Sequence, residues 1–182
     1  MIRVYLVRHG QAIAGGNTEP DPGLDPAGHE QAREAARRLS ANGPLPIIAS
    51  PLRRTRETAG PFELMWGQQA RIESRVSEIP SDGMTLAERA EWLRTLPERR
   101  WSEMSETLLA WRRGIIECVS SISEDSVVVS HYMVINAVVG WVSSDDRLVC
   151  CHPLPGSCTV LERSGSSFRI HEPDQQGTSR VV

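Results

Sequence analysis

The sequence predicts an α/β fold: a three-layer α/β/α sandwich around a mainly parallel central sheet. Apolar runs rich in β-branched residues, at 2–7 and 126–130, are typical of buried strands. Segments whose apolar residues recur at helical spacing alternate with these runs and with a shorter apolar run at 45–49. Strands that alternate with helices usually form parallel sheets with helices on both faces.

Proline and glycine set the expected limits of the first two helices. Asp25 followed by Pro26 is typical of a helix start and predicts a helix over 26–42. The second helix follows the strand at 45–49, and Gly60-Pro61 is expected to break or kink it after about two turns. The Gly- and Pro-rich stretch 11–23 reads as a loop, and loops after a site strand often carry function.

The later elements follow the same reasoning. Thr85 and Glu88 form a capping-box pattern before a third helix. Residues 173–182 are polar and are expected to form a frayed tail. The other expected elements are a short strand near 71–73, a helix over 104–122, a buried helix over 133–142, and a hairpin of 159–162 with 168–170.

Length and composition limit the class of protein. The 182 residues, 40% of them apolar, suit one globular domain over 1–182. No apolar run approaches the length of a membrane span, and Arg3 and Arg8 interrupt the first run, so we expect a cytoplasmic protein without a signal peptide. The four cysteines show no ligand spacing and are expected to be reduced and buried.

The charge pattern limits the partners. The net charge is −3, which argues against a nucleic-acid partner, because such proteins usually carry a basic excess. All 20 positive residues are arginine. Any anion site must therefore consist of arginine, histidine and backbone groups.

Three strand ends carry cationic side chains. The first strand ends at Arg8 and His9, and the strand at 126–130 ends at His131. The helix after the strand at 45–49 opens with arginines at 53, 54 and 56. If these ends meet at one edge of a parallel sheet, two imidazoles and at least two guanidiniums surround one point. That set suits a tetrahedral dianion, because guanidinium binds phosphate oxygens bidentately.

Each feature also has a simpler interpretation. Arg8 and His9 could form a surface ion pair, the three arginines could be a solvated helix face, and His131 could be a core histidine. The coincidence of all three at strand ends favours a phosphoryl site.

These residues match the motifs of a known family. Leu6-Val7-Arg8-His9-Gly10 resembles the signature of the histidine phosphatases, a superfamily that includes phosphoglycerate mutases. The stretch from Ser50 to Ala59 is similar to the second motif, and Val128-Val129-Ser130-His131 to the third. The resemblance covers residues 2 to about 163 and implies the phosphoglycerate mutase-like fold.

The resemblance also implies roles for individual residues. His9 would be the nucleophile that becomes a phosphohistidine, while Arg8, Arg54 and His131 would hold the transferred group. Arg54 is chosen over its neighbours because it lies two residues after Leu52. No metal or cofactor is implied, since arginines supply the charge.

The general acid and one binding residue stay open. Glu78 is similar to the family's acid, but the residues after it depart from the pattern, so Asp82 and a subtype without a dedicated acid remain alternatives. Asn17 lies where the family often has a phosphate-contacting side chain.

The expected activity is hydrolysis of a small phosphomonoester. The segment between Glu73 and Ser102 lacks the long insertion of the mutases, which favours hydrolysis over transfer. The alternatives are a phosphatase of phosphohistidine on a partner protein, a mutase, and a non-catalytic module that binds a phosphorylated ligand. The oligomeric state is not indicated.

Overall fold

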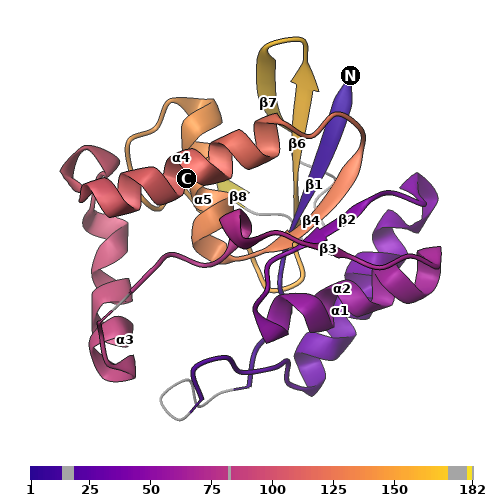
Figure 1. Cartoon of the computed structure of the whole chain (residues 1–182), viewed down its shortest axis with the longest axis horizontal. Coiled ribbons are helices and arrows are strands. Elements are labelled where there is room, and N and C mark those ends of the chain that lie inside the picture. Colours follow the sequence, from indigo (N-terminus) through magenta and orange to yellow (C-terminus); the bar gives the residue numbers. More distant parts are fainter. Residues whose placement is uncertain (14–18, 82, 172–179, 182) are drawn as a thin grey trace.

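The centre of the structure is a mixed six-stranded sheet in the order β3-β2-β4-β1-β6-β7. The structure is a computed structural model that describes residues 1–13, 19–81, 83–171 and 180–181 (Figure 1). The first four strands are mutually parallel, and β6 and β7 run antiparallel to them. The strands are β1 (Ile2–Arg8), β2 (Ile47–Ala49), β3 (Arg71–Ile72), β4 (Ser126–Ser130), β6 (Cys158–Ser164) and β7 (Ser167–His171).

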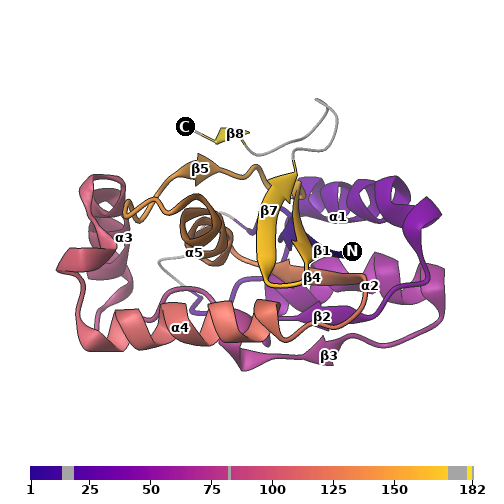
Figure 2. The ribbon, with the colours of Figure 1, turned by 90° about the horizontal axis from the view of Figure 1, so that it is seen from above.

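Helices cover both faces of this sheet, as Figures 1 and 2 show. On one face lie α1 and α2, and on the other lie α4 and α5, with α3 on the same side as α4 and α5 but farther from the sheet. Their bounds are α1 (Pro26–Leu39), α2 (Arg53–Trp66), α3 (Leu86–Thr95), α4 (Glu106–Ser120) and α5 (Tyr132–Ser143). The expected sandwich class is therefore confirmed.

Residues 4–7 of β1 and 127–129 of β4 are apolar on both sides of the sheet because each face packs against helices. In β1, Val4 and Leu6 point to the core under α4 and α5, while Tyr5 and Val7 point to the core under α1 and α2. Successive side chains of a strand alternate between faces, so a strand covered twice reads as a continuous apolar run. This accounts for the runs at 2–7 and 126–130.

Capping residues start the helices where the sequence predicts. The Asp25 side chain accepts a hydrogen bond from the Gly28 backbone N–H at the start of α1. The α-helix ends at Leu39 and continues as a 3-10 turn over Ser40–Asn42, which together span the predicted 26–42. At α3, Thr85 and Glu88 form the predicted reciprocal capping box.

The expectation that Gly60-Pro61 breaks the second helix is wrong. The helix α2 continues through Pro61 to Trp66 and ends at Gly67, whose φ of 65° suits a left-handed cap. Beyond the proline, Phe62 is completely buried against the sheet and its ring lies 5.5 Å from that of Trp66. Burial of this aromatic pair outweighs the one helical hydrogen bond that Pro61 cannot donate.

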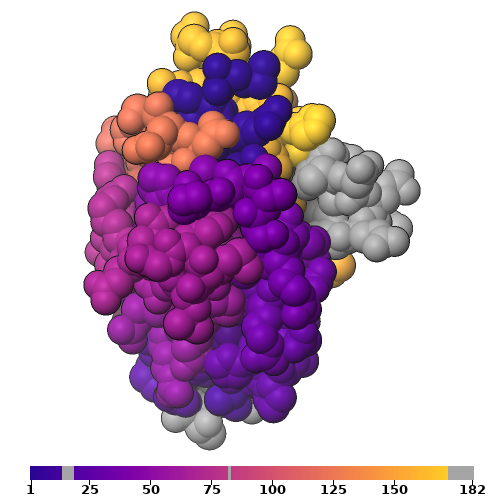
Figure 3. All heavy atoms as spheres, turned by 90° about the vertical axis from the view of Figure 1, so that its right-hand side faces the viewer, coloured from indigo at the N-terminus to yellow at the C-terminus, as the bar shows by residue number. Residues whose placement is uncertain are grey.

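The C-terminal part forms the predicted hairpin of β6 and β7. Most of the expected tail from 173 lies outside the described residues, but β8 (Arg180–Val181) pairs with β5 (Cys151–His152) instead of fraying. Figure 3 shows the flank opposite α3, where α1, α2 and β3 form most of the surface. Within the described ranges, no helix has the length and apolar character that crossing a membrane requires.

Candidate active site

The ends of β1, β2 and β4 meet at one edge of the sheet. Val7 and Ala49 both pair with Val129, and Arg8 pairs with Ser130, so the three strands end level with one another. The His9 backbone N–H donates to the Ser130 carbonyl at 2.9 Å, which extends the β1–β4 ladder by one residue. The parallel register therefore brings the residues that follow these strands, His9, Ser50 and His131, to the same edge.

Arg54 joins the two histidines. It lies in the first turn of α2 and is only 9% exposed. Its Nε donates to Nε2 of His9 at 3.2 Å, and its Nη2 is 3.2 Å from Nδ1 of His131. Arg53 and Arg56 are exposed on the same helix. Of the three arginines, the helix turns only the middle one towards the histidine rings, whose centroids are 5.3 Å apart.

The contacts of His9 select one neutral form of its ring. Nδ1 lies 2.7 Å from the Gly10 carbonyl oxygen, which can only accept, so the proton is on Nδ1. Nε2 then carries a lone pair and receives the Arg54 N–H. Burial, followed by the charge of Arg54, lowers the His9 pKa to about 3. His9 is therefore a neutral imidazole at physiological pH, as a nitrogen nucleophile must be.

His131 is fixed in the complementary form. Its Nδ1 accepts from Arg54, so Nε2 carries the proton and lies 2.8 Å from the Ser50 hydroxyl oxygen. His131 is completely buried, and burial lowers its pKa well below the usual value, as does the charge of Arg54. Both rings are therefore uncharged at physiological pH.

Arg8 supplies the second guanidinium. Its Nη1 donates to the Pro153 carbonyl at 2.8 Å, and the guanidinium lies over the Tyr132 ring at 5.2 Å from the centroid. Its Nε is buried and has no hydrogen-bond partner among the described residues. A buried donor without an acceptor is costly, and a bound anion would satisfy it.

Glu78 interacts electrostatically with both guanidiniums. Its negative charge raises the pKa of Arg8 and of Arg54, while burial lowers both. Burial raises the pKa of the Glu78 carboxyl despite these positive neighbours and despite the hydrogen bond from the Ile79 backbone N–H. A carboxyl group with a raised pKa is suited to donate a proton. The rival Asp82 and the proposed phosphate contact Asn17 both lie outside the described residues.

Several residues of the site were not identified from the sequence. Asp21 accepts from the Arg53 backbone N–H at 2.9 Å and pairs with Nη1 of Arg54 at 3.8 Å. Thr58 accepts from the Gly10 backbone N–H at 3.0 Å, and Ser50 holds His131. Ser50 and Thr58 belong to the second motif, which was a usable signal. Asp21 stands in a Pro-rich loop with no such signal.

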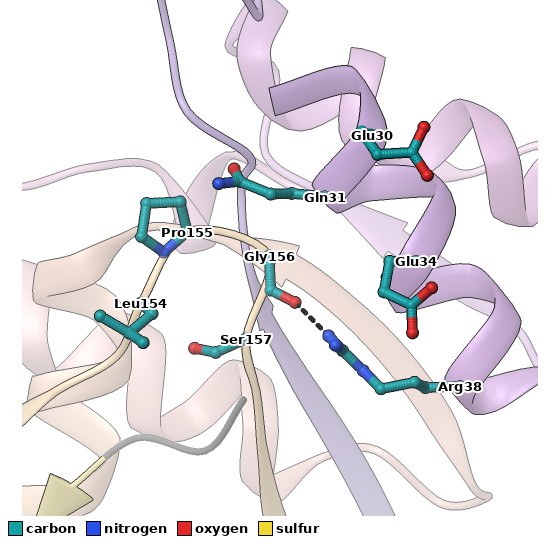
Figure 4. Close-up of a pocket in the computed structure, with 8 residues that line it drawn as sticks. All are labelled: Glu30, Gln31, Glu34, Arg38, Leu154, Pro155, Gly156 and Ser157. Carbon is teal, nitrogen blue, oxygen red and sulfur yellow. Dashed lines mark hydrogen bonds between the residues drawn. The ribbon is translucent and has the colours of Figure 1, made fainter. Parts of the chain in front are cut away.

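The described residues contain no group of three or more His, Cys, Asp or Glu side chains able to hold a metal ion. A cavity of about 270 Å³ lies between α1 and residues 154–157 (Figure 4). Arg38 crosses it and donates to the Gly156 carbonyl at 2.7 Å. No residue of the histidine–arginine cluster lines this cavity.

Two guanidiniums, two neutral imidazoles and a carboxyl with a raised pKa are groups whose chemistry suits the binding and transfer of a phosphoryl group. The comparison with known families agrees. The profile of the histidine phosphatase superfamily (branch 1) matches residues 4–175, and the chain belongs to this superfamily.

Curated relatives include two proteins named probable phosphoglycerate mutase GpmB. That of Erwinia tasmaniensis is 28% identical over 163 residues, and that of Photorhabdus laumondii is 27% identical over 165 residues. Each match covers 78% of this chain and 75% of the relative.

Solved structures show the same fold. YhfR of Bacillus stearothermophilus has a TM-score of 0.76 at 22% identity, over 93% of this chain and 95% of its own. A mycobacterial glucosyl-3-phosphoglycerate phosphatase, in complex with VO3, has a TM-score of 0.73 at 23% identity, over 94% of this chain and 98% of its own. The phosphoglycerate mutase-like fold is thereby confirmed.

Proposed function

We propose that this protein is a phosphatase that hydrolyses phosphomonoesters through a phosphohistidine on His9. The observation that carries the proposal is the neutral His9 ring, whose Nδ1 proton is held by the Gly10 carbonyl and whose Nε2 lone pair faces Arg54. A nucleophile in its reactive form thus lies next to the charge that a phosphoryl group requires.

The first half-reaction transfers the phosphoryl group to His9. Nε2 attacks phosphorus while the bond from phosphorus to the ester oxygen breaks. Glu78 gives its proton to that leaving oxygen. Arg54 shifts its Nε–H from His9 to a phosphoryl oxygen, and Arg8 supplies its buried Nε–H. The charge on the equatorial oxygens is stabilised by both guanidiniums, which is the main source of catalysis in phosphoryl transfer.

The second half-reaction restores the enzyme. Water attacks the phosphohistidine, its proton passes to the Glu78 carboxylate, and the bond between Nε2 and phosphorus breaks. Inorganic phosphate leaves. Every group returns to its starting protonation state, so the cycle requires no metal or cofactor.

The proposed substrate is a small phosphomonoester. The main alternative within the same chemistry is phosphohistidine on a partner protein. The names of the curated relatives favour a second candidate function, phosphoglycerate mutation. We prefer hydrolysis because only about thirty residues separate Glu73 from Ser102. A mutase must keep water from the phosphoenzyme, and this segment lacks the long insertion of that class.

The decisive experiment compares wild type with His9→Ala on an aryl phosphate. Wild type should release phosphate and form an acid-labile, base-stable phosphoenzyme, and the variant should do neither. Phosphate binding by a wild type that does not hydrolyse would instead support a non-catalytic binding module.

A second assay separates hydrolysis from mutation. With 3-phosphoglycerate, a mutase forms 2-phosphoglycerate faster than inorganic phosphate, and a phosphatase does not. The same assay with a phosphohistidine-bearing protein tests the alternative substrate class.

A further inference from the structure

Arg8 is held on two sides and free on a third. Its Nη1 is engaged by the Pro153 carbonyl, and one face of the guanidinium lies on the Tyr132 ring. The remaining edge, Nε with Nη2, makes no hydrogen bond to the described residues, and Nε is buried. This edge is the two-donor fork that binds two oxygens of a phosphoryl group.

Tyr132 is itself fixed at both ends. It is the first residue of α5, directly after His131. Its hydroxyl oxygen lies 2.7 Å from Nδ1 of His152, and its backbone carbonyl accepts from the Asn136 side chain at 3.0 Å. Asn136 also accepts from the backbone N–H groups of Cys150 and Cys151, the residues that lead into Pro153. One network therefore holds both contacts of Arg8, the tyrosine ring and the proline carbonyl.

We propose that Tyr132 is a positioning residue for Arg8: its ring fixes the plane of the guanidinium so that the Nε–Nη2 edge faces the phosphoryl group. This inference rests on the proposed function, because it assigns Arg8 to the phosphoryl site.

The physical reason is the flexibility of arginine. A free arginine side chain loses about 2 kcal/mol of rotamer entropy when one geometry is selected, and a guanidinium already fixed by its surroundings has lost that freedom before the substrate arrives. A neutral ring suits this task. It attracts the guanidinium face without occupying its donors and without repelling a phosphate dianion.

The test measures binding of inorganic phosphate by titration calorimetry or ³¹P NMR. Tyr132→Phe keeps the ring and loses the hydroxyl, so it should bind within about threefold of wild type. Tyr132→Leu loses the ring and should bind roughly three- to thirtyfold more weakly, the range expected for a cation–π contact. Trp141→Leu is the matched control, because it removes a ring from the same helix that packs on Phe168 at 4.7 Å instead of on Arg8. The control should bind phosphate like wild type even where its melting temperature falls.

A double-mutant cycle decides whether Tyr132 acts through Arg8. Lysine keeps a charge at position 8 but has no two-donor fork, so in an Arg8→Lys background Tyr132→Leu should cost much less than in wild type. An equal cost in both backgrounds, or equal binding by Tyr132→Leu and wild type, overturns the proposal. The proposal is also overturned if Trp141→Leu binds phosphate more weakly in proportion to its loss of stability. The weaker binding of Tyr132→Leu would then follow from a general loosening of α5.

Failure of this inference is distinguishable from failure of the proposed function. If wild type binds phosphate but hydrolyses no ester, the phosphatase proposal fails while the binding cycle still tests Tyr132. If wild type hydrolyses esters and the cycle shows no coupling, only the role of Tyr132 fails. If wild type does not bind phosphate at all, both are overturned.

Discussion

Replacing Arg54 by alanine should abolish most activity, whereas the same change at Arg53 should have almost no effect. Arg54 is buried and contacts both histidines at 3.2 Å. Loss of one preorganised donor to a transition-state oxygen costs about 10²–10³ in kcat. Arg54 supplies two such donors and a full charge, so we expect kcat/KM to fall by about 10³–10⁴, or about 4–5.5 kcal/mol of transition-state stabilisation.

The control follows from exposure. The Arg53 side chain is 49% exposed and its Nε pairs with Glu57 one turn along the helix at 2.7 Å. Such exposed pairs contribute about 0.3–0.5 kcal/mol, so Arg53→Ala should keep activity within about twofold, as should Arg56→Ala, whose side chain is also exposed. The assay is steady-state hydrolysis of an aryl phosphate, with urea unfolding to show that each variant folds.

A second readout tests the electrostatics directly. The charge of Arg54 is one cause of the lowered His9 pKa, so Arg54→Ala should raise that pKa in an NMR titration. The reasoning would be refuted if Arg54→Ala kept more than about a tenth of wild-type activity, or if all three alanine variants lost activity equally.

Three further predictions concern protons, stability and the fold. Glu78→Gln should lower kcat more for alkyl than for aryl phosphates. It should also remove the alkaline limb of the pH profile, because wild-type activity is lost as pH rises through the raised Glu78 pKa. An unchanged alkaline limb would exclude Glu78 as the acid. The unfolded chain protonates His9 and His131 below about pH 6.5, whereas the folded protein does not. In urea unfolding without phosphate, the contribution of these histidines to the free energy of unfolding should be constant above this pH and should fall below it by up to about 1.4 kcal/mol per pH unit for each histidine. A flat profile between pH 6 and 4.5 would contradict the buried neutral rings. Pro61→Ala should raise the free energy of unfolding by about 1–2 kcal/mol, since alanine restores a helical N–H inside α2. A lower free energy of unfolding would show that the proline ring itself packs favourably.

The fold was largely predictable because its strands are covered on both faces. The apolar residues at 4–7 and 127–129 fit strands that are covered by helices on both faces. Caps at Asp25 and Thr85 mark helix starts through contacts three residues away. Such local signals can be read along the chain. The proline in α2 could not be judged in this way, because its cost is local while the burial of Phe62 that offsets it depends on the sheet beneath.

The sequence by itself also determined which residues follow the strand ends, and hence that His9, His131 and an arginine of α2 would meet once the strands were parallel. Only the tertiary structure decided their chemical state. The proton on Nδ1 of His9 depends on how its ring is turned towards the Gly10 carbonyl, and the raised Glu78 pKa depends on the burial of its carboxyl group. The support of Arg8 by Pro153 joins residues 145 positions apart. Protonation and orientation are properties of the packed environment, and no pattern along the chain encodes them.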